Sequence, residues 1–348
     1  MTSDVERLFA QFRAPGLLQE FREMFQPRAL ECLQVEVTSC CTGKCTYCPH
    51  TTRADVWKSR HMKPETFAAL WPVMVKTGRV HLQGWGEPFL NPHFMDFAEL
   101  ARRAGCAVST TTYGLGMTED LAERIVASGM DIVAFSLVGT DEASNGARAA
   151  VPFSRVKEAV RLLQQARRKR NAVHLEIHLA YLMLASNVEA VRNLPQLMDE
   201  WGVHAAGIST MDYIPSPEMA KEAFAPHERE KIEAARAVLE DVGAKVRAAG
   251  RDFYASLPAP EPAPFCRERA HKTLYVDAEG YISPCVYLNV PLREPQPNRT
   301  VFGNVLEESP LAIWAKPGYA DFRAAVQTAD PPSACVSCAK RFEAPCAQ

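Results

Sequence analysis

Apolar positions along the chain follow two periods in turn, which predicts alternating strands and helices. Leu33 to Thr38 alternates apolar and polar residues, as a half-buried strand does. Residues 64–75 begin with proline and space their apolar side chains like a single helix, and residues 79–83 have the pattern of the next strand. The same criteria predict later helices near 93–104, 118–128, 152–169 and 187–201, and strands near 106–111, 131–136, 173–180 and 204–210.

Six predicted strands, each followed by a helix, indicate an α/β fold in which a parallel sheet curls into a partial (β/α)6 barrel of the TIM type. The last predicted helix is charged and Ala-rich, near 226–249. Four prolines follow within residues 257–264, a spacer that cannot continue a helix or sit inside a sheet. The predicted domains are an N-terminal helical extension over 1–30, the barrel over 31–255, and a small cysteine-rich α+β domain over 256–348.

Composition narrows the class of protein. The 348 residues are 47% hydrophobic and 23% charged, which excludes a disordered or fibrous chain. Lys plus Arg number 39 against 41 for Asp plus Glu, so no whole-molecule field would attract nucleic acid or an anionic membrane. No stretch is apolar enough to span a membrane, and the N-terminus has early acidic residues rather than a signal peptide. We expect a cytoplasmic protein with a small or neutral partner.

Eleven cysteines are unusual in such a chain, because a reducing compartment keeps structural disulfides open. They gather toward the two ends of the sequence, with Cys106 alone between residues 48 and 266. That clustering predicts metal binding rather than packing.

The first group contains Cys41-x3-Cys45-x2-Cys48, directly after the first predicted strand. Three thiolates on one tight loop can hold three corners of a cubane 4Fe-4S cluster, leaving the fourth iron open for a substrate or cofactor. The loop lies at a strand's C-terminal end, where α/β barrels keep their active sites. A zinc ion completed by Cys40 or His50 is one alternative, and a cluster that uses Cys40 in place of Cys41 is another.

This spacing, with Tyr47 before the last cysteine, resembles the radical S-adenosylmethionine (SAM) superfamily. Three later segments resemble that family's motifs in the right order: Gly84-Trp85-Gly86-Glu87-Pro88, Thr111-Thr112-Tyr113-Gly114, and Ser136-Leu137-Val138-Gly139 followed by Arg148. The resemblance implies that Cys41, Cys45 and Cys48 are the catalytic cluster ligands. It also implies that SAM is bound by Tyr47, Gly84, Gly86, Glu87, Thr112, Ser136 and Arg148.

In this resemblance Glu87 complements the methionine ammonium group, and Ser136 and Arg148 contact the ribose and carboxylate. Three residues depart from the family pattern: Trp85 replaces a glycine, Tyr113 an asparagine and Val138 an aspartate. The implied chemistry is reductive cleavage of SAM to a 5'-deoxyadenosyl radical, which abstracts hydrogen from a substrate carbon.

The second group resembles Twitch, the shortened relative of the SPASM domain. It implies one auxiliary 4Fe-4S cluster, fully ligated by Cys266, Cys285, Cys335 and Cys338. Residues 275–285 independently have the pattern of a hairpin. A four-cysteine zinc site is the rival interpretation. Cys346 is a spare thiol or an alternative ligand, and we expect Cys32 and Cys106 to be buried packing residues.

A fully ligated auxiliary cluster can carry an electron but cannot chelate substrate. We therefore expect a radical SAM oxidoreductase that dehydrogenates a small hydroxylated metabolite, with a flavodoxin or ferredoxin as electron donor. The first thirty residues are too short for a peptide-binding domain, which favours a small substrate over a peptide. The alternatives are an epimerase with Cys40 or Cys346 as hydrogen donor, a peptide or cofactor maturase that forms C–S or C–C bonds, and a non-catalytic zinc-binding scaffold.

Other candidate residues carry weaker signals. His81, His174, His178 and His204 lie on predicted strands, where a hydrogen-bonded core histidine is more frequent than a substrate acid or base. Asp212 and Tyr213 follow the sixth predicted strand, at the end of the barrel where substrate groups belong.

Overall fold

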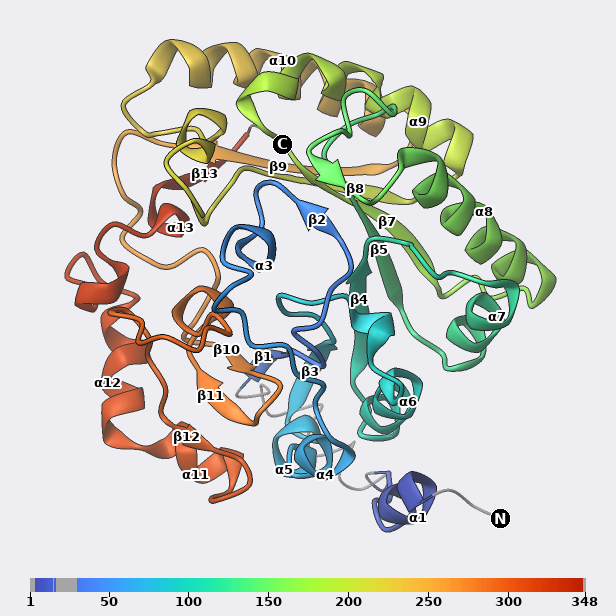
Figure 1. Ribbon diagram of the computed structural model, residues 1–348, viewed down its shortest axis with the longest axis vertical. Helices are drawn as coiled ribbons and strands as arrows, with labels where there is room; N and C mark the ends of the chain where they lie inside the picture. The colour runs from blue at the N-terminus through green and yellow to red at the C-terminus, as the bar shows by residue number, and fades with distance from the viewer. Residues whose placement is uncertain (1–3, 15, 17–29, 347–348) are drawn as a thin grey trace.

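The computed structural model describes residues 4–14, 16 and 30–346. Its largest element is an eleven-stranded sheet with the order β12-β11-β10-β1-β3-β4-β5-β7-β8-β9-β13. Figure 1 shows this sheet curving, with helices along its outer side. The strands are β1 (Leu30–Val35), β3 (Thr77–His81), β4 (Ala107–Thr112), β5 (Ile132–Leu137), β7 (Glu176–Leu182), β8 (Ala205–Ser209), β9 (Asp252–Pro258), β10 (Thr273–Val276), β11 (Tyr281–Ser283), β12 (Gly303–Asn304) and β13 (Glu343–Pro345).

The six strands β1, β3, β4, β5, β7 and β8 are parallel to their neighbours, which confirms the predicted partial barrel. The helices that follow them are α4 (Pro64–Ala68), α5 (Trp71–Met74), α6 (Phe94–Arg103), α7 (Glu119–Ala127), α8 (Phe153–Lys169), α9 (Leu194–Trp201) and α10 (Arg229–Ala248). The other α-helices of the described residues are α1 (Asp4–Ala10), α3 (Pro49–Thr52), α11 (Pro310–Ala315), α12 (Pro317–Ala325) and α13 (Ala339–Phe342).

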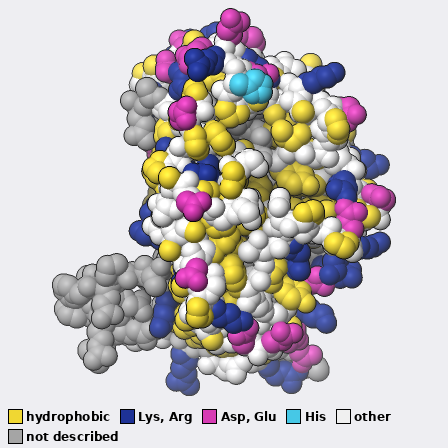
Figure 2. All heavy atoms as spheres, turned by 90° about the vertical axis from the view of Figure 1, so that its left-hand side faces the viewer, with side chains coloured by type: hydrophobic (Ala, Val, Ile, Leu, Met, Phe, Trp, Pro, Cys, Tyr) yellow, Lys and Arg dark blue, Asp and Glu magenta, His cyan; other side chains and the backbone are white. Residues whose placement is uncertain are grey.

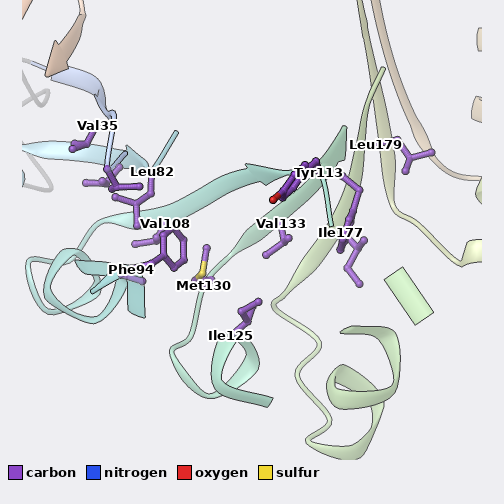
Figure 3. Close-up of a cluster of buried hydrophobic side chains, with 14 of the residues drawn as sticks. Val35, Leu82, Phe94, Val108, Tyr113, Ile125, Met130, Val133, Ile177 and Leu179 are labelled. Atoms are coloured by element: carbon purple, nitrogen blue, oxygen red, sulfur yellow. The ribbon is translucent and has the colours of Figure 1, made fainter. Parts of the chain in front are cut away.

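Alternation along each strand separates a packed outer face from a more open inner face. On β5, Val133, Phe135 and Leu137 are fully buried, whereas Ile132, Ala134 and Ser136 are only partly buried. Figure 3 shows the buried layer, in which strand side chains such as Val133 pack with Phe94 of α6 and Ile125 of α7. The period of two along the strands therefore leaves the inner face for the functional site.

Two predicted helices are interrupted by proline. The single helix predicted over 64–75 is divided into α4 and α5, because Pro72 has no N–H to donate to the preceding turn. The helix predicted over 187–201 begins as a 3-10 segment over Ala185–Asn193, and α9 starts only at Leu194, with Pro195 in its first turn. Both corrections concern boundaries and leave the order of elements unchanged.

The C-terminal part adds strands to both edges of the barrel sheet. The predicted hairpin is present: β10 pairs parallel with β1, and β11 pairs antiparallel with β10. The prediction missed β9, which is parallel to β8 and includes Leu257 and Pro258. Pro258 was therefore wrongly excluded from the sheet, whereas Pro260, Pro262 and Pro264 lie outside the strands as predicted. Pro258 is tolerated because it is the last residue of its strand, where it pairs with Glu343 of β13.

The predicted N-terminal extension over 1–30 contains α1, whose Phe9 ring packs against Phe97 of α6. Its apolar residues Leu17, Leu18, Phe21 and Phe25 lie outside the described residues. The boundary predicted at residue 256 stays a prediction, since hydrogen-bonded strand pairs join the two sides of it.

Figure 2 shows the side of the molecule that carries the C-terminal part, with hydrophobic side chains through the middle and charged side chains around them. Among the described residues, no helix combines the length and apolar character that crossing a membrane would require.

Candidate functional site

The loop after β1 carries the first three candidate ligands and is anchored from several directions. Thr38 donates from Oγ1 to the carbonyl oxygen of Arg60 at 2.9 Å, and Trp57 donates from its indole to the carbonyl oxygen of Ser39 at 2.8 Å. Cys45, in the short strand β2 (Lys44–Cys45), pairs antiparallel with Arg148 of β6 (Arg148–Ala149). Figure 1 places β2 and α3 inside the curve of the barrel strands.

Cys41, Cys45 and Cys48 come together at this place. Burial raises the pKa of the Cys41 thiol to about 11 and that of Cys48 to about 12, and the neighbouring Cys45 thiol raises both further. Cys40 instead contributes its backbone, because its carbonyl oxygen accepts from the Glu87 N–H at 2.9 Å. Three clustered thiols that disfavour free thiolates suit a donor set for positively charged iron.

The Gly84–Glu87 turn lies directly against the cysteine loop. A Cβ on Gly86 would come within 2.4 Å of the Thr38 carbonyl oxygen, so only glycine allows this approach. The Glu87 carboxylate is buried and accepts from Thr112 Oγ1 at 2.6 Å and from the Tyr113 N–H at 2.9 Å. Burial also raises the pKa of Glu87 to about 7. The predicted residues Glu87 and Thr112 thus bind one another, and Glu87 anchors the turn after β4.

Tyr113, which departs from the family pattern, ties that turn to the cysteine loop. Its hydroxyl lies 2.8 Å from Thr42 Oγ1. Val138, the other departure after a barrel strand, is fully buried, and its N–H donates to Asn145 Oδ1. Both substitutions therefore replace a polar motif residue with a structural contact.

Three predicted SAM contacts meet around Arg148. The guanidinium Nη1 of Arg148 donates to Ser136 Oγ at 2.7 Å and to Tyr47 Oη at 3.3 Å. Arg148 is only 4% exposed, yet its Nε finds no hydrogen-bond partner among the described residues. A buried guanidinium with an unused N–H fits a carboxylate such as that of the methionine part of SAM.

The second set of candidate ligands also comes together. Cys266, Cys285, Cys335 and Cys338 line one cavity of about 200 Å³. Burial raises the pKa of all four thiols, that of Cys335 to about 12, and the thiols of Cys266 and Cys338 add to the effect at Cys285 and Cys335. Four soft sulfur donors around one enclosed space fit a fully ligated iron–sulfur cluster.

In the part of the chain that the structure describes, no three His, Cys, Asp or Glu side chains form the ligand set of a single metal ion. This finding concerns mononuclear sites such as zinc. In a cubane cluster each thiolate binds a different iron, and the sulfur atoms stand farther apart.

Three further cysteines, Cys32, Cys106 and Cys346, line neither cysteine site. Cys346 is buried at the edge of the sheet, where its N–H donates to the carbonyl oxygen of Ala255 and its side chain lines a different cavity from the four cysteines, so the alternative that it ligates the auxiliary cluster stays without support. Cys106 is a buried packing residue as predicted, and its thiol donates to the Met74 carbonyl oxygen. Cys32 is instead only partly buried, because on β1 it faces the inside of the barrel.

Inside the barrel, toward the beginnings of its strands and so at the end opposite the cysteine loop, lies a cavity of about 1010 Å³, which we call the lower chamber. Its walls include small and polar inward residues where filled barrels carry bulky aliphatic ones: Cys32, Gln34, His81, Ser109, Ala134 and His178. His81 bonds to Ser109, and burial lowers its pKa to about 4, so it is neutral at pH 7. His204 accepts from the Ile177 N–H and has a structural role.

Sequence reasoning missed a buried cation beside the auxiliary cavity. Lys340 Nζ lies 2.9 Å from Asp212, 3.3 Å from Glu268 and 3.2 Å from Glu343. Asp212 also accepts from the Tyr287 hydroxyl at 3.0 Å. The only local signal was the position of Lys340 two residues after Cys338.

Comparison with known proteins agrees with this geometry. The model of the radical SAM superfamily matches residues 35–191, and that of the SPASM iron–sulfur cluster-binding domain matches residues 266–339. A tungsten-containing aldehyde ferredoxin oxidoreductase cofactor-modifying protein of Pyrococcus furiosus is 23% identical over 326 residues, or 89% of this chain and 87% of that protein. A PqqA peptide cyclase of Ruegeria pomeroyi is 26% identical over 249 residues, or 69% of this chain and 64% of that protein.

Solved structures share the fold. Streptococcus suis SuiB bound to S-adenosylmethionine has a TM-score of 0.66 and 14% identity over 92% of this chain and 74% of that one. Native anSMEcpe with bound AdoMet has a TM-score of 0.64 and 15% identity over 85% of this chain and 83% of that one. This protein belongs to the radical SAM superfamily, as an enzyme that uses SAM, a SAM-binding 4Fe-4S cluster and an auxiliary cluster held by a C-terminal SPASM-type domain.

Proposed function

We propose that this enzyme matures a peptide, or a cofactor made from one, by forming a C–C or C–S bond. The observation that carries the proposal is that the two sets of cysteines lie near one another at the end of the barrel where the strands end. Trp85, in the turn beside the first set, contacts Tyr213 and Tyr287, which line the cavity of the second set. A bond-forming oxidation needs an electron acceptor close to the substrate radical, and a second cluster there would supply one. The relatives named as a cofactor-modifying protein and as PqqA peptide cyclases support this choice.

In this proposal Cys41, Cys45 and Cys48 hold the SAM-binding cluster. When bound, that cluster supplies the electron that cleaves SAM to methionine and a 5'-deoxyadenosyl radical. Arg148 donates its unused N–H to the methionine carboxylate, while Ser136 and Tyr47 hold the guanidinium in place. Glu87 and Thr112 fix the turn that borders SAM.

Cys266, Cys285, Cys335 and Cys338 hold the auxiliary cluster, whose role is electron transfer because four protein ligands leave no open position. Joining a carbon to a second carbon or to sulfur removes two hydrogens from the substrate. One leaves as an atom and forms 5'-deoxyadenosine. The other would leave as a proton to solvent, and a cluster held by these four cysteines would take up its electron.

The expectation of a small hydroxylated substrate finds no support among these relatives. The epimerase alternative is weakened as well, since Cys346, one of its two candidate hydrogen donors, lies at the sheet edge away from both cysteine sites. Cys40 stays a candidate donor.

The test is anaerobic incubation of reconstituted enzyme with SAM, a reductant and peptides encoded beside its gene. The expected result is a peptide lighter by two hydrogens, formed with one 5'-deoxyadenosine per product. Cys45→Ala is the inactive control, and Cys346→Ala is the matched control that keeps activity. Turnover of a hydroxylated metabolite with no change in any peptide would contradict the proposal. Replacing the chemical reductant by flavodoxin or ferredoxin tests the expected electron donor.

A further inference from the structure

The turn Gly84–Glu87, which borders the predicted SAM site, contacts the cysteine loop on one side and the C-terminal part of the chain on the other. On one side Gly86 packs against the backbone of residues 38–40, and the Glu87 N–H donates to the Cys40 carbonyl oxygen at 2.9 Å. Trp85, directly before Gly86, is the residue that replaces a glycine of the family pattern. The hydrogen bond and ring contacts of its side chain lie on the other side of the turn.

The contacts of Trp85 reach the C-terminal part of the chain. Its indole N–H donates to the carbonyl oxygen of Val286 at 3.2 Å, next to the candidate ligand Cys285. Its ring meets those of Tyr213 and Tyr287 edge-on, with centroids 5.6 Å and 6.2 Å away. Both tyrosines line the cavity that holds the four cysteines.

The backbone of Trp85 is tied to the same region through a buried carboxylate. The Trp85 N–H donates to Glu36 Oε2 at 2.9 Å, and the Tyr275 hydroxyl of β10 donates to that same oxygen at 3.2 Å. Glu36 is 1% exposed and packs so tightly that a Cβ on Gly84 would come within 2.4 Å of it. Backbone and side chain of Trp85 thus both depend on residues 275–287.

We propose that Trp85 is a positioning residue that couples the two cofactor sites, so that a loaded auxiliary site holds the SAM-binding turn in its productive conformation. The proposal rests on Cys285 as an auxiliary ligand and on Gly84–Glu87 as a SAM contact, and it holds whatever the substrate is. A cluster on Cys285 fixes the segment that carries Val286 and Tyr287. That segment fixes Trp85, and Trp85 fixes the turn between Gly84 and Glu87.

Linkage makes the coupling measurable without any substrate, because binding at one site must then change affinity at the other. Emptying the auxiliary site with Cys335→Ala and Cys338→Ala leaves Cys285 and Val286 in place. It should weaken SAM binding at least about fivefold. In a Trp85→Gly background, which restores the family's glycine, the same two substitutions should change SAM affinity by a factor near one.

The experiment is a double-mutant cycle read by equilibrium dialysis with labelled SAM, with iron content confirming which sites are loaded. Trp85→Phe keeps the ring contacts but removes the N–H donor, and it should give an intermediate factor. If the Trp85→Gly variant does not fold, Trp85→Phe tests the coupling between the two sites in its place. Trp314→Phe is the matched control, because Trp314 packs on Tyr319 of the same C-terminal part at 5.1 Å without touching the turn. In the Trp314→Phe background, the two cysteine substitutions should weaken SAM binding as much as they do in the parent.

The proposal would be overturned if the two cysteine substitutions weakened SAM binding by the same factor in the parent, Trp85→Gly and Trp85→Phe backgrounds. It would also be overturned if they left SAM affinity unchanged in the parent. Since the measurement uses only SAM, a failure here leaves the proposed peptide chemistry untouched. Failure to modify any peptide likewise leaves the coupling intact.

Discussion

Buried cations lie beside the thiols of both cysteine sites, and they differ in their hydrogen-bond partners. At the site of Cys41, Cys45 and Cys48, Arg148 uses one nitrogen for Ser136 and Tyr47 and leaves Nε without a partner among the described residues. At the four-cysteine site, Lys340 is surrounded by three carboxylates, all within 3.3 Å. Arg341 lines the same cavity, donates only to backbone carbonyl oxygens, and also leaves its Nε without a partner among the described residues.

The difference that separates the two sites is the number of thiols. Three thiolates leave one iron of a cubane cluster open to a ligand such as SAM, whose carboxylate Arg148 can meet with its unused N–H, whereas four thiolates leave no iron open. The comparison therefore supports the proposal that the first site generates the radical and the second transfers electrons.

The largest expected effect comes from removing a ligand of the open site. Cys45→Ala should abolish SAM cleavage, because two thiolates cannot hold a cubane cluster in place of three. The measurement is 5'-deoxyadenosine by chromatography after anaerobic reconstitution with reductant. Cys346→Ala, which removes a buried thiol elsewhere, should cleave SAM at the parent rate. Equal loss in both variants would mean that the assay reports general damage.

Removing a ligand of the closed site should separate SAM cleavage from product formation. Cys266→Ala should still form 5'-deoxyadenosine at saturating SAM but make no modified substrate, because the electron acceptor is gone. Iron content should fall by about half if each site holds one cluster. Normal product formation without the second cluster would refute the electron-transfer role.

The buried ion cluster predicts a large effect on stability. Lys340→Met leaves three carboxylates near one another without their cation, and loss of one partner of a buried ion pair costs about 3–5 kcal/mol. Denaturant unfolding, with Lys245→Met in parallel, checks this. Lys245 pairs with Asp241 at the surface, so its loss should change the free energy of unfolding by less than about 1 kcal/mol. Similar values for the two variants would show that the Lys340 cluster adds nothing.

Arg148→Gln tests whether the unpartnered N–H of Arg148 binds SAM, and its expected effect on the enzyme is smaller. A hydrogen bond to a charged group contributes about 1.5–3 kcal/mol, so SAM affinity should fall about 10- to 100-fold. Equilibrium dialysis measures this directly. Arg155→Gln, on the exposed side of α8, is the control with parent affinity. An unchanged dissociation constant for Arg148→Gln would exclude the carboxylate contact.

Much of the barrel could be predicted because its signals are local. Period-two and helical patterns predict the six strands and the order of their helices. Cys41, Cys45 and Cys48 share one short loop, so their spacing is visible in the sequence itself. The errors have local causes too. Pro72 and Pro195 interrupt helices that their apolar spacing predicts as continuous, and β9 was missed because its last residues begin the proline-rich segment.

No local sequence pattern predicts the contacts that join the C-terminal part of the chain to the barrel. Trp85 and Val286 are 201 residues apart in sequence, and Tyr287 and Asp212 are 75 apart. Only the curvature of the sheet, which sets β10 beside β1, brings them together. The sequence identified Trp85 as a departure from the family pattern, but the reason for that departure lies in tertiary contacts.

The central claim is that one cysteine site is open to SAM and the other is closed. The direct measurement is electron paramagnetic resonance of two reduced variants, each with a single cluster, before and after addition of SAM. The account predicts that SAM shifts the spectrum of Cys266→Ala, which keeps the three-cysteine site, and leaves that of Cys41→Ala/Cys45→Ala/Cys48→Ala unchanged. A SAM-dependent shift in the triple variant would contradict it.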